Sequence, residues 1–230
     1  MKKESIINFK SLKEQVYDYL RDEIHKHNLR PGSAVNMGAI SKKLGISKTP
    51  LRDALIQLEM EDFVTIKARR GIFVNPLTLE DIRNYYQVIG ALESSALINS
   101  FNKIGPAEIK KMNKLNNEMR AAVDKNRFEL FFKKNLEFHN TYIEPCGNRH
   151  LIKTLTNLKN RLYDFPQQEE WIKDWELSSL GEHQKIVDFI AEGKVQEAAN
   201  AIHDVHWSFR VQEKFIMRYY FPAPRENESS

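Results

Sequence analysis

The sequence has 230 residues, of which 41% are hydrophobic and 29% are charged, and its formal net charge is +4. This length supports one large domain or two modest ones, no segment approaches the ~20 consecutive apolar residues of a membrane span, and the N-terminal residues lack the apolar core of a secretory signal. The single cysteine, Cys146, excludes a disulfide framework within the chain and is typical of a reducing compartment, so we expect a cytoplasmic protein.

The basic excess lies in the first third of the chain. Residues 1–77 contain 14 Lys and Arg against 9 Asp and Glu, whereas the remainder contains 21 and 22. A basic N-terminal region on a near-neutral body is typical of proteins that bind a polyanion. A balance of this size is also common on ordinary surfaces, so charge alone does not decide the function.

Residues 11–77 show the periodicities of three helices followed by a β-hairpin. Apolar residues recur at helical spacing between positions 12 and 24, and the Pro31-Gly32 turn lies beyond the end of that helix. After Asp62 the apolar period changes to two, which is typical of strands. The predicted helices cover about 12–27, 37–44 and 47–61, and the predicted strands cover 63–67 and 72–74. This order of elements is that of a winged helix-turn-helix.

The N-terminal end of the third predicted helix carries the residues expected to contact DNA. In a helix-turn-helix, the second helix of the motif lies in the major groove with this end at the base edges. Lys48 and Arg52 are one turn apart and project from one face, and both donate hydrogen bonds to guanine or phosphate. Thr49 suits a phosphate or a thymine methyl group. We therefore predict that these three residues bind double-stranded DNA.

The predicted hairpin turn adds a second set of cations. Arg69 and Arg70 precede Gly71 at its tip, from which cationic side chains reach a minor groove or the phosphate backbone. Taken singly, each charge is better interpreted as a solvated surface residue. Their order on these elements favours DNA contacts instead, and we include all three residues in the predicted DNA-binding surface.

The same region resembles the N-terminal domain of the GntR family of transcription regulators. The matching residues are Val16, Leu20, Ile24, Leu29, Pro31, Gly32, the run 44–55, Leu58, Glu59, Gly71 and Val74. The resemblance implies DNA contacts from Lys48, Thr49, Arg52, Arg70 and Gly71. Family members usually have Arg where this chain has Lys48 and Glu where it has Asp53. Lysine keeps the charge but loses the bidentate fork of arginine, so we expect an altered operator preference.

Everything after Thr78 reads as helix, with turn residues between the segments. The predicted helical segments cover about 79–102, 106–125, 127–143, 148–164, 174–192 and 195–219. The chain is therefore expected to be mainly α. The expected boundaries are 1–10 for a flexible arm, 11–77 for the winged domain, 78–221 for a helical effector-binding and dimerisation domain, and 222–230 for a disordered tail.

The helical region resembles the FadR subfamily of GntR regulators, whose C-terminal domain is of the six-helix FCD type. The local matches are Leu92-Glu93, Glu137-Phe138-His139, Gly147-Asn148, Glu182-His183 with Ile186, and Gly193 with Ala198, Ala201 and Ile202. Two other C-terminal domains of the family do not fit, because an α/β sugar-sensing domain needs strands and an aminotransferase-like domain needs far more residues. The resemblance implies an all-α six-helix antiparallel bundle that binds a small effector.

Members of this group commonly hold a divalent metal through an Asp, a His four residues later and two further His on the last two helices. By this resemblance, the ligand positions are Asn135, His139, His183 and Val205. Asn135 supplies only a neutral amide oxygen, and Val205 supplies no ligand. His206 lies next to it on the inward stripe of its predicted helix, so a slight rotation would let it replace the missing ligand. We predict one zinc, nickel or manganese ion per chain at Asn135, His139, His183 and His206, with a metal-free pocket as the alternative.

These four residues are also candidates for effector binding, together with Arg161. Family members often carry an Arg four residues before the Glu of the Leu-Glu pair, where it suits a carboxylate effector, but this chain has Ile89 there. Arg161 is a candidate substitute, although a surface charge is the simpler interpretation. The resemblance implies an organic acid as the effector, and an apolar or acyl ligand is the alternative.

The sequence predicts a homodimeric transcription regulator, acting as the repressor of a metabolic operon, with one winged domain on each half-site of a near-palindromic operator. Effector binding in the helical domain would shift operator affinity.

One alternative is a metal-free regulator or an architectural DNA binder with a structural dimerisation domain. A remote alternative is a metal-dependent enzyme. Against it, the chain has no nucleophile motif, and no carboxylate is expected to pair with His139, because helix geometry turns Glu137 and Glu182 about 100° away from the adjacent histidines. We expect no catalytic residues and no membrane contact.

Overall fold

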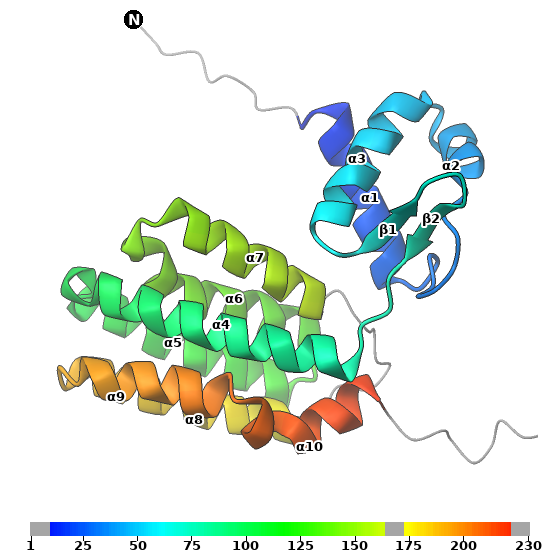
Figure 1. Ribbon diagram of the computed structural model, residues 1–230. Coiled ribbons are helices and arrows are strands. Elements are labelled where there is room, and N and C mark those ends of the chain that lie inside the picture. The colour runs from blue at the N-terminus through cyan, green and yellow to red at the C-terminus, as the bar shows by residue number, and fades with distance from the viewer. Residues whose placement is uncertain (1–9, 164–172, 222–230) are drawn as a thin grey trace, which may run out of the picture. The chain divides into compact units, whose positions relative to one another are not determined.

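The computed structural model describes residues 10–163 and 173–221. The chain divides into two compact units (Figure 1). The first contains the described residues up to Thr78 and the end of α7 (Arg149–Tyr163) from Asn160 onward, and the second contains residues 79–159 and the described residues from 173. Residues 1–9 of the predicted arm and the whole predicted tail lie outside the described residues.

The first unit consists of three helices and a two-stranded antiparallel sheet. Its elements are α1 (Leu12–His25), α2 (Met37–Leu44), α3 (Lys48–Met60), β1 (Val64–Lys67) and β2 (Gly71–Val74). Ser11 and Glu14 form a capping box that begins α1. The Asn36 side chain accepts a hydrogen bond from the Ala39 N–H at the start of α2, and Gly45 ends that helix in the left-handed region with φ 65°. The predicted order of helices and strands is confirmed.

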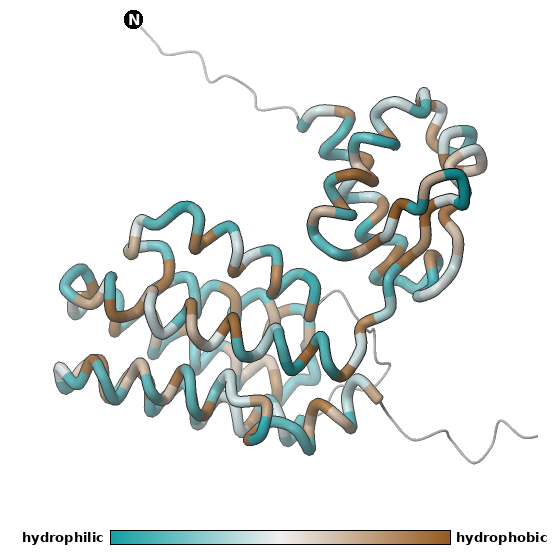
Figure 2. Tube along the Cα trace, viewed as in Figure 1, coloured by the Kyte–Doolittle hydropathy of each residue, from teal (hydrophilic) through white to brown (hydrophobic). Residues whose placement is uncertain are grey.

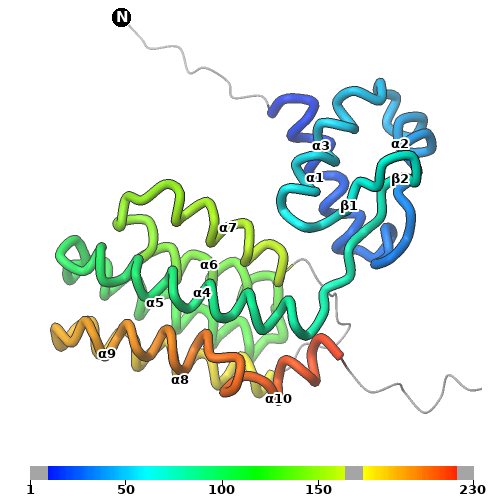
Figure 3. The backbone as a smooth tube through the Cα atoms, in the orientation of Figure 1, coloured from blue at the N-terminus to red at the C-terminus, as the bar shows by residue number. Residues whose placement is uncertain are grey.

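The core of the first unit is formed by the apolar faces of its helices, closed by the sheet. Its buried members are Val16, Leu20, Ile24, Val35, Ile40, Leu51, Ala54, Leu55, Leu58, Phe63, Val64, Ile72 and Val74. The apolar stripe of α3 lies wholly inside this core, which leaves the opposite face of α3 in solvent. Pairing of Val64 with Val74 and of Lys67 with Gly71 sets the register of the hairpin, whose path is seen in Figure 3.

The second unit is a helical bundle that also contains α7 up to Lys159. Its other helices are α4 (Leu79–Ser100), α5 (Pro106–Asp124), α6 (Phe128–Ile143), α8 (Lys173–Ala191), α9 (Val195–Asn200) and α10 (Phe209–Tyr220). Helix α5 packs against α6 and α8, and α4 packs against α6 and α9. Hydrophobic and hydrophilic residues interleave along these helices (Figure 2), as in helices that bury one face. None of the described helices is long and apolar enough to cross a membrane.

The last predicted helical segment, 195–219, is not one continuous helix, and that prediction is wrong. It begins as α9, widens into the π-helical turn η3 (Ala201–His206), and breaks at Ser208 before α10 begins. The N–H of Trp207 donates to the carbonyl of Ile202, five residues earlier, at 2.9 Å. A π-turn holds one residue more than an α-turn, which rotates the following residues by about 100°. The mainly α fold class, with a winged helix-turn-helix before a helical bundle, is nevertheless confirmed.

Candidate DNA-binding surface and candidate metal centre

The predicted DNA-contacting residues of α3 lie on its exposed face. Lys48, Thr49 and Arg52 are exposed in its first two turns. Leu51 and Leu55 on the opposite face are fully buried, so the core holds the helix while the polar side chains extend into solvent. The structure thus brings the three residues together at one end of α3.

The turn between β1 and β2 carries the other predicted cations. Arg69 and Arg70 are exposed there beside Lys67, and the Arg70 N–H donates to the Lys67 carbonyl at 3.0 Å. Gly71 has a φ of 114°, in the region that favours glycine. The role that the structure supports for Gly71 is therefore to form the tight turn that presents the two arginines.

The helical unit brings three histidines together in its interior. His139 lies on α6, His183 on α8 and His206 in η3, and one ring nitrogen of each lies within 4.8 Å of the other two. His139 and His183 are fully buried, and the side chain of His206 is 10% exposed. These are the three histidines that the sequence selects as candidate metal ligands.

The π-helical turn places His206 in this cluster. His206 follows His183 by 23 residues, one more than the spacing that led to Val205. Val205 is 39% exposed, because the extra residue of η3 turns position 205 outward and position 206 inward. The predicted rotation is present, but as a local π-turn rather than a rotation of the whole helix.

Glu93 on α4 orients His139, which corrects the expectation that no carboxylate pairs with this histidine. The Glu93 Oε2 lies 2.9 Å from the His139 Nδ1, and the Tyr142 hydroxyl donates to the same oxygen at 2.5 Å. Glu93 also forms a buried ion pair with Lys159. Because Nδ1 is engaged in this way, the ring nitrogen left for a metal is Nε2, which is buried without a hydrogen-bond partner among the described residues.

Glu182 on α8 plays the same part for His206. Its Oε2 lies 2.8 Å from the His206 Nδ1, so it pairs with this residue rather than with its sequence neighbour His183. A carboxylate behind a ligand histidine fixes the tautomer and the ring orientation in metal sites. Sequence reasoning missed both Glu93 and Glu182 in this role, and their only signal was their place in the Leu-Glu and Glu-His matches.

His183 and Asn135 carry further unsatisfied polar atoms. The His183 Nδ1 and the Asn135 Oδ1 are buried without hydrogen-bond partners in the described part of the chain. The His183 ring stacks on Phe138 with centroids 4.3 Å apart. Asn135 precedes His139 by one turn of α6, so the two share a helix face. Unpaired buried acceptors are costly, and a bound cation would satisfy them.

Burial keeps the two core histidines neutral. It lowers the pKa of His139 to about 4 despite the opposing effect of Glu93, and burial, reinforced by nearby His206, lowers the pKa of His183 well below its usual range. Burial alone would raise the pKa of Glu93, but His139 and Lys159 outweigh it and hold that pKa well below its usual range. At neutral pH these two residues therefore offer uncharged imidazoles, the form that binds metals.

Arg161 is not brought into the histidine cluster. It belongs to the first compact unit, where its Nε donates to the Asp62 carbonyl at 3.0 Å and its Nη2 donates to the Pro76 carbonyl at 2.8 Å. Its guanidinium also lies 5.4 Å from the ring centroid of Phe63. The prediction that Arg161 binds the effector finds no support in these contacts.

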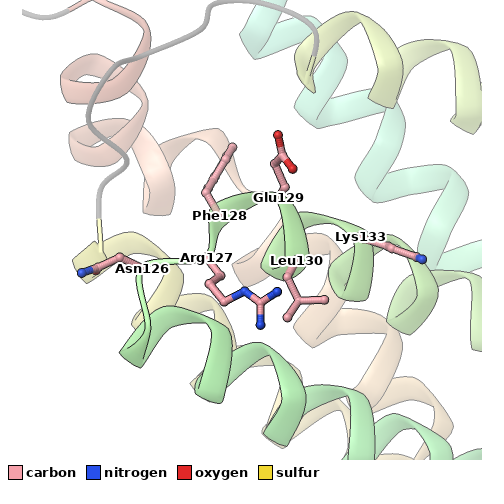
Figure 4. Close-up of a pocket in the computed structure, with 6 residues that line it drawn as sticks. All are labelled: Asn126, Arg127, Phe128, Glu129, Leu130 and Lys133. Carbon is pink, nitrogen blue, oxygen red and sulfur yellow. The ribbon is translucent and has the colours of Figure 1, made fainter.

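A surface pocket of about 510 Å³ lies at the turn between α5 and α6 (Figure 4). It is lined by Asn126, Arg127, Phe128, Glu129, Leu130 and Lys133. Its charged side chains are exposed, and it contains none of the predicted site residues. We assign no function to it.

The winged helix-turn-helix and the helical bundle together define a two-domain DNA-binding regulator. Residues 12–74 match the family model of bacterial regulatory proteins of the gntR family, and residues 84–206 match the FCD domain. The chain therefore belongs to the GntR family of bacterial transcriptional regulators, and its helical domain is an FCD domain. The family is one of regulators rather than of enzymes.

Curated relatives and solved structures agree with this assignment. The chain is 28% identical over 175 residues to the Nta operon transcriptional regulator of Aminobacter aminovorans, covering 75% of this chain and 80% of that protein. It is 23% identical over 146 residues to the transcriptional repressor RspR of Escherichia coli, covering 64% of each. The fold is similar to that of E. coli McbR/YncC, with a TM-score of 0.67 at 16% identity over 90% of this chain and 96% of that one. A GntR regulator from Rhodococcus sp. RHA1 also has a TM-score of 0.67, at 18% identity over 90% and 98%.

Proposed function

We propose that this protein is a homodimeric repressor whose operator affinity is set by a small organic acid, bound together with one divalent metal in the FCD domain. The observation that carries the proposal is the cluster of His139, His183 and His206, whose ring nitrogens lie within 4.8 Å of one another. That one relative is named a repressor supports the direction of regulation.

The proposed operator contacts come from α3 and from the hairpin turn. Lys48, Thr49 and Arg52 are exposed at the end of α3 that a helix-turn-helix presents to base edges. Arg69 and Arg70 are exposed at the hairpin tip, from which they reach phosphates or the minor groove. In a dimer, each winged domain occupies one half-site of a near-palindromic operator.

The histidine cluster fits a divalent metal through the chemistry of its donors. Neutral imidazoles with an oxygen ligand suit zinc, nickel or manganese. The ligands in this proposal are His139, His183 and His206, with the amide oxygen of Asn135 as the fourth. When bound, such an ion supplies a Lewis-acidic centre that attracts an anionic ligand.

Charge balance favours an organic acid as the effector. The four proposed ligands are uncharged in their metal-binding forms, and the charge of Glu93 is balanced by Lys159 in a buried ion pair. A divalent ion would therefore leave excess positive charge in a buried site even with Glu182 nearby, and buried unbalanced charge is costly. A carboxylate on the effector would reduce that excess, whereas an apolar or acyl chain would not.

Two measurements on the purified protein test this proposal. Elemental analysis should find about one zinc, nickel or manganese ion per chain in the wild type and substantially less in His139→Ala and His183→Ala. Gel retardation should show binding to the DNA upstream of its own coding region at low salt. A protein that retards no such fragment, with or without cell extract, contradicts the proposal.

Asn135, where the family carries Asp, favours one competing function. A neutral amide binds a divalent ion more weakly than a carboxylate, so a regulator or architectural DNA binder without metal is the rival. It predicts operator binding with no metal above background in the elemental analysis and no thermal stabilisation by added zinc.

A further inference from the structure

A chain of hydrogen bonds leads away from His206 through side chains that are not among the proposed metal ligands. The Glu182 Oε2 accepts a hydrogen bond from the His206 Nδ1 at 2.8 Å. The other carboxylate oxygen of Glu182, Oε1, accepts one from the Gln212 Nε2 at 3.0 Å. The Gln212 Oε1 in turn accepts from the Trp175 Nε1 at 2.9 Å. The chain joins η3, α8 and α10.

Gln212 is the centre of this chain. It is 2% exposed, and its Nε2 also donates to the carbonyl of Val205, in η3, at 3.3 Å. The side-chain amide therefore bonds to three partners from two elements, α8 and η3. A buried polar group satisfied in this way is rigid and specifies one arrangement of its neighbours.

The donor and acceptor types fix the direction of every bond in the chain. An indole N–H can only donate, so the oxygen of the Gln212 amide must face Trp175 and its nitrogen must face Glu182. An ionised Glu182 can only accept. The Nδ1 of His206 must then be the donor to Glu182, which leaves Nε2 as the ring nitrogen that can face a metal.

From this geometry we infer that Glu182 and Gln212 are positioning residues that hold His206 as a metal ligand. The inference rests on the proposed metal site and adds the residues that allow His206 to serve in place of the family position at 205. Glu182 sets the tautomer of His206. Gln212 holds Glu182 and, through its bond to the Val205 carbonyl, the π-turn that points the His206 ring inward.

The π-turn makes this support necessary. If η3 relaxed to a regular α-helix, position 206 would rotate outward and the apolar Val205 would take its place.

Metal affinity is the first readout. Zinc and nickel are titrated into the chelator-stripped full-length protein in competition with a chromophoric chelator. Glu182→Gln and Gln212→Met should each weaken binding about 10- to 100-fold, the usual cost of removing an orienting partner, and Glu182→Asp should recover part of the loss. Glu213→Gln makes the same chemical change at an exposed site on α10 and should leave affinity unchanged. Equal affinity in the wild type and in Glu182→Gln overturns the inference.

The tautomer of His206 is the second readout and needs no metal or activity. Nitrogen-15 chemical shifts of the metal-free wild type should identify the Nδ1–H tautomer at His206, and Glu182→Gln should lose that preference. Detection of the Nε2–H tautomer in the wild type overturns the inference even if the variants fail to fold. A wild type that shows the Nδ1–H tautomer but binds no metal overturns the metal site of the proposed function and supports the hydrogen-bond assignment.

Discussion

At the scale of single residues, the site depends on carboxylates that sequence reasoning did not connect to it. Glu93 and His139 are 46 positions apart, and Glu182 and His206 are 24 apart. Pairing over such separations follows from how helices pack, which local periodicity does not report. His139 and His183 could be selected because they match a family pattern, and His206 could be selected because it lies next to Val205, the position that the pattern gives for the last ligand.

The acidity of His139 leads to a prediction about stability. Its pKa is about 4 in the folded protein and about 6.5 when unfolded, so between these values the unfolded state binds more protons. The free energy of unfolding of the metal-free protein should therefore fall as pH falls from 7 toward 4, by about 2 kcal/mol at pH 5 from His139 alone.

Urea unfolding at pH 7, 6 and 5 measures this effect. Tryptophan fluorescence reports on the helical domain, because all three tryptophans follow residue 170. His139→Gln should show a weaker pH dependence over the same range. Equal stability of the chelator-stripped wild type at pH 7 and pH 5 is the result that contradicts the assignment of a neutral, buried His139.

Arg52 supports a prediction about operator binding. Arg52→Ala removes a cation from the exposed end of α3 and should weaken specific operator affinity by about 1–3 kcal/mol. Fluorescence anisotropy with a labelled operator measures the change. Lys185→Ala, at an exposed position on α8, is the matched control and should have no effect. A loss of equal size in both variants would point to general electrostatics instead of a contact surface.

At the scale of elements, the sequence predicts the helices and the hairpin but not the π-turn. The stripe of α3, the change of period after Asp62 and the glycine breaks are local signals, and each matched an observed element. The π-turn reflects tertiary packing. A Cβ on Gly90 of α4 would lie 3.0 Å from the Trp207 Cβ. Trp207 therefore approaches α4 this closely because position 90, more than a hundred positions away in the sequence, is a glycine.

The π-turn gives a prediction about a deletion. Asp204 is exposed within η3, and deleting it should convert the turn to a regular α-helix that still points the following histidine inward, now 22 residues after His183. We expect zinc affinity within about tenfold of the wild type, a difference below about 1.4 kcal/mol.

Deletion of Glu213 is the control for this experiment. It removes a residue from the regular helix α10, rotates buried Ile216 out of the core, and should destabilise the helical domain by about 2 kcal/mol or more. A folded Asp204 deletion variant that has lost zinc binding would show that η3 does not compensate for an inserted residue.

At the scale of the whole molecule, the chain contains a DNA-binding domain and an FCD domain, and the FCD domain contains the cluster of three histidines. An effector can change operator affinity only if it binds the operator-bound and operator-free states of the protein with different affinities. A metal that merely stabilises the fold would bind without altering operator affinity. Metal content and operator binding must therefore be measured together with an effector.

The most direct test measures operator affinity by fluorescence anisotropy for metal-loaded protein against a panel of mono-, di- and tricarboxylic acids. We expect at least one acid to weaken operator binding of the wild type by about 5- to 150-fold, the usual range of allosteric coupling. We expect the same acid to have no effect on His183→Ala. A panel without effect on the wild type, or an equal response from His183→Ala, would contradict the claim that the histidine cluster is the effector site.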